Sequence, residues 1–132
     1  MTINNVLGLD VGRKRIGVAR VNTIARLPEP IVTLSNDNQF TSRLKDLIHI
    51  YSIDTIVVGL PRSLDGNETD QSSYTRDFAK GLEYFNLPVV FQDETLSSVE
   101  AESRLKGSKT YEKSKIDSMA AVIILEDYLK TI

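Results

Sequence analysis

The sequence predicts an α/β domain built on a mixed five-stranded sheet with helices on both faces. Apolar and polar residues alternate along the first part of the chain, a pattern typical of antiparallel hairpin strands. A continuous apolar run of strand length follows at 55–60 and a further strand at 88–92, and stretches with helical spacing lie between and around them. This order combines an antiparallel β-meander with parallel strands that are joined by crossover helices.

The first half of the chain holds the predicted meander. Strands at 4–11 and 16–21 flank the turn 12–15, and a third strand at 31–34 follows two prolines. A helix comes next, marked by apolar residues three and four positions apart: Phe40, Leu44, Leu47, Ile48 and Tyr51.

The second half alternates strands and helices. The run 55–60 is apolar throughout, as expected for a parallel strand that is covered on both faces. The remaining elements follow in order: a loop at 61–67, a helix at 71–84, a strand at 88–92, a helix at 97–107 that opens with capping-box spacing, a loop to 114, and a helix at 115–130.

Length and composition narrow the class of protein. The 132 residues predict one domain, 1–132. There is no cysteine and only one histidine, which excludes zinc fingers, thiol nucleophiles, disulfides and histidine-dependent triads. No apolar stretch reaches the length of a membrane span, and no basic region precedes an apolar one at the N-terminus, so we expect a cytoplasmic protein without membrane association.

Basic residues are clustered although the net charge is −2. One cluster, Arg13 to Arg15, directly follows the first strand, and a second lies between residues 104 and 115. Each cluster is compatible with a solvated turn, but beside a carboxylate site each becomes a candidate for holding phosphates. The candidate phosphate-binding residues in these clusters are Arg13, Lys14, Lys106, Lys109, Lys113 and Lys115.

Asp10 interrupts the apolar run 6–12, where an unpaired carboxylate is strongly disfavoured. Such a residue is tolerated when a cation, often a metal ion, lies against it. Gly8 and Gly12 favour this interpretation, because a missing side chain lets a ligand or another backbone approach closely. The alternative is an aspartate at the strand end that caps the following turn.

Two further acidic positions are candidates for the same site. Asp93 and Glu94 follow a strand, and adjacent strand residues point to opposite faces, so at most one of them can join Asp10. Asp117 heads an apolar stripe of the last helix, where a charge is not expected. Both positions also have a simpler interpretation: an acidic pair at a helix N-terminus, and a capping box formed with Ser114.

Three carboxylates in one pocket would repel each other, by about 4 kcal/mol per pair at about 4 Å and an effective dielectric constant near 20. A divalent cation reverses the sign of this interaction. Carboxylate oxygens suit Mg²⁺ or Mn²⁺. Two such ions can activate a water molecule and stabilise the leaving oxygen in phosphodiester hydrolysis, a chemistry that requires neither cysteine nor histidine.

Four motifs in order resemble the YqgF-like family, also called Holliday junction resolvases or pre-16S ribosomal RNA nucleases, over nearly the whole chain. The motifs are LGLDVG (7–12) with RIGVA (15–19), VVGLP (57–61) with LDG (64–66), DETLS (93–97) with VEAE (99–102), and KIDSMAA (115–121) with ILEDYL (124–129). The resemblance implies a ribonuclease H-like three-layer fold and a metal-dependent nuclease.

The resemblance also implies which residues act. It assigns the catalytic and metal-ligand roles to three carboxylates: Asp10, Glu94 and Asp117. Thr95 stands where the family usually has arginine, so a basic group near the substrate phosphate would come from elsewhere, with Arg13 and Arg62 as the candidates.

The leading functional hypothesis is an endonuclease acting on structured nucleic acid, with maturation of the ribosomal RNA precursor as its role. Cleavage of four-way DNA junctions uses the same chemistry but requires a dimer with two symmetric sites. Both a monomer and a homodimer are compatible with the sequence. A non-catalytic protein that docks on RNA, the ribosome or the transcription machinery is a further alternative. An ATP-binding phosphotransferase is disfavoured, because proteins with a similar phosphate-binding hairpin pair two such domains.

Overall fold

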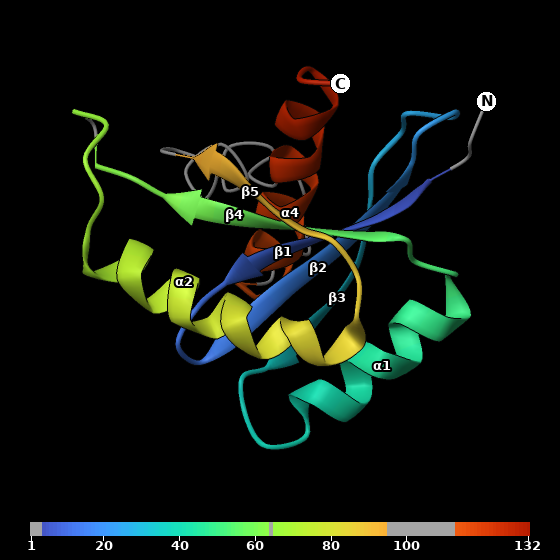
Figure 1. Cartoon of the computed structure of the whole chain (residues 1–132), viewed down its shortest axis with the longest axis horizontal. Helices are drawn as coiled ribbons and strands as arrows, with labels where there is room; N and C mark the ends of the chain where they lie inside the picture. Colours follow the sequence, from blue (N-terminus) through green and yellow to red (C-terminus); the bar gives the residue numbers. More distant parts are fainter. Residues whose placement is uncertain (1–3, 64, 95–112) are drawn as a thin grey trace.

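The computed structural model describes residues 4–63, 65–94 and 113–132. Five strands form one mixed sheet in the order β3-β2-β1-β4-β5 (Figure 1), which confirms the predicted architecture. The strands are β1 (Asn5–Val11), β2 (Arg15–Asn22), β3 (Glu29–Ser35), β4 (Thr55–Pro61) and β5 (Val89–Glu94). The helices are α1 (Phe40–Ile50), α2 (Asp70–Gly81), the short 3-10 helix η1 (Leu82–Phe85) and α4 (Lys113–Leu129).

The strand register brings three strand ends together. β1 pairs with β2 in antiparallel fashion, so that Asp10 lies opposite Gly17. β1 and β4 are parallel, as are β4 and β5, with Pro61 opposite Glu94. The C-terminal ends of β1, β4 and β5 therefore lie side by side at one end of the sheet (Figure 1). Ligand-binding and active sites of such sheets are found beyond the C-terminal ends of the strands.

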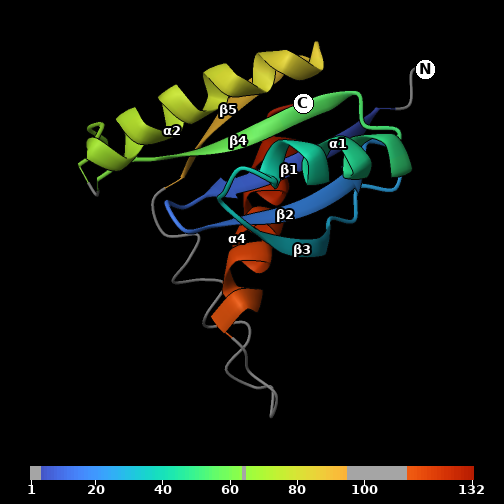
Figure 2. The ribbon, with the colours of Figure 1, turned by 90° about the horizontal axis from the view of Figure 1, so that it is seen from below.

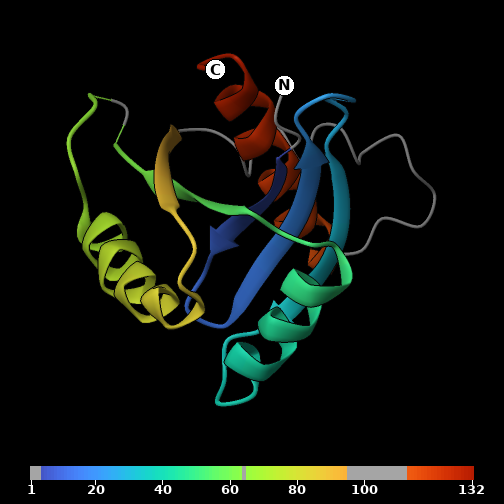
Figure 3. The same ribbon diagram turned by 45° about the vertical axis from the view of Figure 1, so that its right-hand side comes forward.

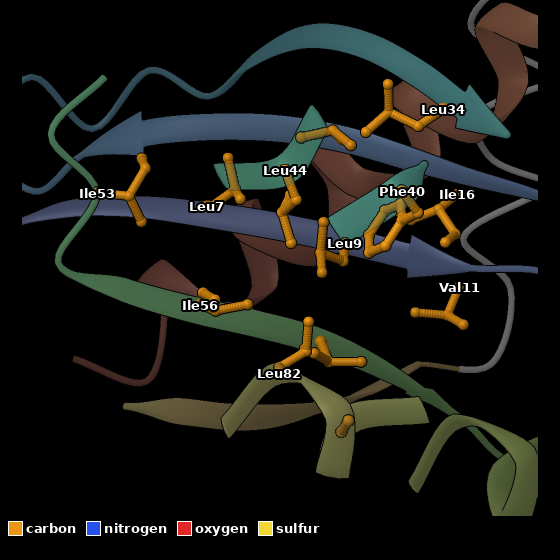
Figure 4. Close-up of a cluster of buried hydrophobic side chains, with 13 residues drawn as sticks. Leu7, Leu9, Val11, Ile16, Leu34, Phe40, Leu44, Ile53, Ile56 and Leu82 are labelled. Carbon is orange, nitrogen blue, oxygen red and sulfur yellow. The ribbon is translucent and has the colours of Figure 1, made fainter. Parts of the chain in front are cut away.

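Helices cover both faces of the sheet, with α1 and α2 on one side and α4 on the other (Figures 2 and 3). The side chains of alternate residues in each strand enter two different cores, because successive residues point to opposite faces. Leu7 and Leu9 of β1 contribute to the core beneath α1 and α2, shown in Figure 4. Val6 and Val57 pack instead against Leu125 and its neighbours in α4.

Several predicted boundaries differ from those in the structure. The helix predicted at 71–84 ends at Gly81 and continues as the separate η1 turn. Asp93 and Glu94 are the last two residues of β5 rather than residues beyond it. The helix predicted at 97–107 lies outside the described residues. No helix in the described ranges is long and apolar enough to cross a membrane.

The capping interpretation of Asp117 is wrong for the helix as described. α4 already includes Lys113 and Ser114, so that Asp117 lies one turn into the helix. Its carboxylate accepts a hydrogen bond from the Arg15 side chain. The charge at the head of the apolar stripe therefore needs another explanation.

Candidate carboxylate site and basic groove

Asp10 is mostly buried near the end of β1 and faces the α4 side of the sheet, as do Val6 and Gly8. Burial raises the pKa of its carboxyl to about 8, and the negative charges of Glu94 and Asp117 contribute to the shift. This environment therefore opposes ionisation of Asp10 at neutral pH. The alternative interpretation of Asp10 as a turn cap does not account for such surroundings.

Gly17 determines where Asp117 lies. A Cβ atom on Gly17 would come within 1.9 Å of the backbone oxygen of Asp117, so that the backbone of α4 contacts the backbone of β2 directly. Gly17 is also the cross-strand partner of Asp10. Since directly opposed residues of an antiparallel pair share a face, this contact places Asp117 beside Asp10.

Glu94 reaches the same site from the end of β5. Its Oε2 atom is buried, and it would lie only 2.7 Å from a Cβ atom on Gly59 of the neighbouring strand. Gly59 therefore leaves the space that the Glu94 carboxylate occupies. Ile124 of α4 borders the same space, with its Cδ1 atom 2.4 Å from that Cβ position.

Asp93 points away from this site, as the alternation of strand residues predicts. Its side chain is 63% exposed and accepts a hydrogen bond of 2.9 Å from Nε of Arg62. Arg62 also donates to the backbone oxygen of Gly66 at 3.2 Å. The structure thus brings Asp10, Glu94 and Asp117 together and separates Asp93 from them. It also ties Arg62 to Asp93 and to the loop that follows β4.

A groove of about 410 Å³ lies beside Asp117. The turn between β1 and β2 and the start of α4 border it, and its lining residues are Gly12, Arg13, Lys14, Arg15, Gln71 and Asp117. Three of these six residues are basic. The predicted juxtaposition of the first basic cluster with the carboxylate site is therefore present in the structure.

Hydrogen bonds hold the basic turn in place. Asn36 donates through Nδ2 to the Gly12 carbonyl at 2.9 Å, and its backbone N–H donates to the Lys14 carbonyl at 2.9 Å. The Arg13 guanidinium lies 4.4 Å from the centre of the Tyr74 ring. A turn fixed in this way presents its cations at a defined position next to the site.

The glycines of the first motif allow close contacts within the fold. Leu125 of α4 fills the space at Gly8, where a Cβ atom would lie 2.6 Å from Cγ of that leucine. At Gly12 a Cβ atom would lie 2.6 Å from the carbonyl oxygen of Arg15, so the tight turn needs the missing side chain. The close approach expected at Gly8 is real, but the neighbour is a helix side chain.

Only part of the second basic cluster lies within the described residues. Lys106 and Lys109 lie outside the described residues, as does Thr95. Lys113 is the first residue of α4, and Lys115 is exposed two positions later. These two lysines therefore begin the helix that carries Asp117.

Arg15 is the site residue that sequence reasoning missed. Its Nε donates to Oδ2 of Asp117 at 3.0 Å, across a separation of 102 positions in the chain. The available signal was its position two residues before Gly17 on β2, since residues two apart in a strand share a face. Using this signal requires knowledge that α4 packs on that face.

The chemistry of the three carboxylates fits a hard divalent cation such as Mg²⁺ or Mn²⁺, which prefers oxygen ligands. Burial and the charges of Glu94 and Asp117 raise the pKa of Asp10, and a bound cation would offset the repulsion between these carboxylates. As the side chains stand, no three histidine, aspartate or glutamate residues within the described ranges are grouped as ligands of one ion. Asp117 is paired with Arg15.

Comparisons with known proteins identify the family. The model of the RuvX family, described as Holliday junction resolvase, matches residues 4–131. A relative from Sulfurihydrogenibium sp. (strain YO3AOP1) is 39% identical, with 96% of this chain and 90% of the relative covered. One from Bacillus subtilis (strain 168) is 38% identical, with 96% and 98% covered. A third, from Synechocystis sp., is 41% identical, with 93% and 85% covered. All three bear the name "Putative pre-16S rRNA nuclease".

Solved structures show the same fold at low sequence identity. RuvC from T. thermophilus, in a complex with Holliday junction substrate, has a TM-score of 0.59 at 14% identity and covers 96% of this chain and 94% of its own. The fowlpox virus Holliday junction resolvase has a TM-score of 0.56 at 17% identity, with 96% and 98% covered. These likenesses confirm the ribonuclease H-like architecture. Together with the family match, they show that the chain belongs to the RuvX (YqgF-like) family of nucleases, hydrolases that act on phosphodiester bonds.

Proposed function

We propose that this chain is a metal-dependent endonuclease that processes the 5′ end of pre-16S ribosomal RNA. One observation carries the proposal: Asp10 is mostly buried, burial and the charges of Glu94 and Asp117 raise its pKa to about 8, and a groove with three basic residues adjoins Asp117. Strongly perturbed carboxylates in a cleft are candidates for a functional site. A fold without a ligand gains nothing from this concentration of negative charge.

Each part of the site has a role in this proposal. Asp10, Glu94 and Asp117 would hold the divalent cations, since the charges of Glu94 and Asp117 both act on Asp10. Bound Mg²⁺ or Mn²⁺ would supply an activated water molecule and stabilise the leaving oxygen. Arg13 and Lys14 would bind the phosphates that flank the cleaved bond, because they line the groove beside Asp117.

Ribosomal RNA is the proposed substrate because the relatives named "Putative pre-16S rRNA nuclease" are 38 to 41% identical to this chain over at least 85% of their own length. One domain spanning residues 1–132 would contain the complete site. Since bacterial ribosomal RNA precursors are processed in the cytoplasm, the proposal includes a cytoplasmic location.

Resolution of four-way DNA junctions is the second candidate, favoured by the description of the matching family and by the fold of the RuvC complex. This reaction cuts two symmetric strands, so it requires a dimer whose two sites face opposite strands. Cleavage of ribosomal RNA has no such requirement.

A side-by-side cleavage assay tests the proposal. Purified protein with Mg²⁺ or Mn²⁺ is offered a pre-16S RNA fragment and a four-way DNA junction, and Asp10→Asn protein is run in parallel. We expect metal-dependent cutting near the 5′ end of the RNA, lost in the variant, while the fold and RNA binding persist.

The other outcomes are equally distinct. Cutting of the junction alone would select the second candidate. Binding without cutting of either substrate would indicate a non-catalytic docking protein. Hydrolysis that survives Asp10→Asn would show that the assignment of the metal site is wrong.

A further inference from the structure

The ion pair between Arg15 and Asp117 joins the basic turn to the carboxylate site. Arg15 opens β2, and its side chain is 44% exposed in the groove, whereas that of Asp117 is 23% exposed. The Nε to Oδ2 distance is 3.0 Å. Of the three positive side chains in the groove, Arg15 is the one whose ion pair is with a member of the carboxylate site.

A guanidinium and a divalent cation would compete for the Asp117 carboxylate. Both are positive, so each would repel the other at the same oxygen atoms. Asp117 is close enough to Asp10 to raise its pKa, which places the competition inside the site rather than at its margin. Binding of a cation by Asp117 therefore requires the Arg15 side chain to move away from the Asp117 carboxylate.

The groove offers Arg15 an alternative partner. Arg13 and Lys14 line the same groove and would attract a phosphate group there. The planar guanidinium of arginine matches two phosphate oxygens, as it matches two carboxylate oxygens. Rotation of a half-exposed side chain could therefore exchange one anion for the other with no change in the backbone.

We propose that Arg15 is a latch that couples metal binding to nucleic-acid binding. Without metal it neutralises Asp117, and when a cation takes its place it moves to a phosphate of the substrate in the groove. This inference rests on the proposed function, because it assumes that Asp117 binds a cation. By thermodynamic linkage, metal must then strengthen nucleic-acid binding by the same factor by which nucleic acid strengthens metal binding.

The first test is calorimetric titration of the full chain with Mn²⁺ in the absence of nucleic acid. Since one partly exposed ion pair opposes metal binding, we expect Arg15→Gln to bind Mn²⁺ about fivefold more tightly than the wild type. Arg15→Lys keeps the positive charge and should stay close to the wild type. Lys14→Gln, which removes a nearby charge that is not paired with Asp117, should change the affinity by less than about twofold.

The second test is the affinity for a fluorescent hairpin RNA, measured by fluorescence anisotropy in EDTA and in Ca²⁺. The RNA is checked after each titration to show that it has not been cut. The wild type should bind more tightly with Ca²⁺, and Arg15→Gln should lose this gain. Arg20→Gln is the matched control, since Arg20 lies on the same strand and forms an ion pair with Glu29 at 2.6 Å, away from the carboxylate site. It should retain the gain.

Two results would overturn the latch while leaving the nuclease intact. Arg15→Gln could bind Mn²⁺ no more tightly than Lys14→Gln does, or it could keep the full effect of Ca²⁺ on RNA binding. A wild-type protein that neither binds Mn²⁺ nor cuts RNA would instead overturn the proposed function, and the latch with it.

Discussion

Replacing Asp10 with asparagine should stabilise the metal-free protein at neutral and alkaline pH. Burial and two neighbouring carboxylates raise the pKa of Asp10 from 3.8 to about 8 in the folded state. The folded state therefore holds this proton more tightly than the unfolded state does. The contribution of the Asp10 proton to the stability of the folded state is complete below about pH 4 and is lost as the pH rises toward 8.

The magnitude follows from this shift. One pKa unit corresponds to about 1.4 kcal/mol. Ionisation of Asp10 in the unfolded state at pH 7 therefore lowers the free energy of unfolding by at most about 4 kcal/mol. Asparagine resembles the protonated acid in shape and has no charge to lose. We expect the variant to be about 2 to 4 kcal/mol more stable than the wild type at pH 7, and equal to it near pH 4.

Urea unfolding in EDTA from pH 4 to 8.5 measures this difference. Asp46→Asn is the matched control, since Asp46 is exposed on α1 and far from the carboxylates. It should follow the wild type at every pH. A wild type whose stability is constant or rises over this range relative to Asp10→Asn would refute the reasoning.

Three further predictions follow from the same geometry. Mn²⁺ at pH 8 should raise the melting temperature of the wild type and leave that of Asp10→Asn nearly unchanged, as differential scanning fluorimetry would show, because ligand binding to the folded state stabilises it. Gly17→Ala should cost about 3 kcal/mol or more in urea unfolding, since its Cβ atom would lie 1.9 Å from the Asp117 oxygen. Gly81→Ala, with no atom within 4 Å of its Cβ, should cost less than about 0.5 kcal/mol. Arg13→Ala should weaken RNA binding for all sequences and lower the slope of log affinity against log salt by about 1, because one phosphate contact is lost.

The sheet was predictable because local patterns determine it. Alternating and continuous apolar runs identify all five strands, and the order of elements indicates which pairs are parallel. The alternation of strand residues also predicts that Glu94 and Asp93 point to opposite faces of the sheet. Boundaries were less accurate: α2 ends at Gly81 because the chain tightens there into the η1 turn.

The assembly of the site depends on contacts between distant segments, which local patterns do not contain. Asp117 lies beside Asp10 because Gly17 lets the backbone of α4 contact β2. The phase of Asp117 on its helix indicated that the residue was unusual, but not which strand it would meet. The pairing with Arg15 spans 102 positions and follows only from that contact. The role of Gly8 was misjudged for the same reason, since its neighbour is a leucine on α4.

The most direct test of the carboxylate site compares two adjacent residues of β5. Glu94→Gln and Asp93→Asn each remove one negative charge from neighbouring positions, but only Glu94 faces Asp10. In a cleavage assay with Mg²⁺ and the pre-16S RNA fragment, we predict that Glu94→Gln lowers the rate by more than about 100-fold, since even residues behind the metal ligands contribute 10- to 100-fold. Asp93→Asn should stay within about fivefold of the wild type, because it loses only an exposed ion pair with Arg62. Equal losses in the two variants, or full activity in Glu94→Gln, would contradict the account.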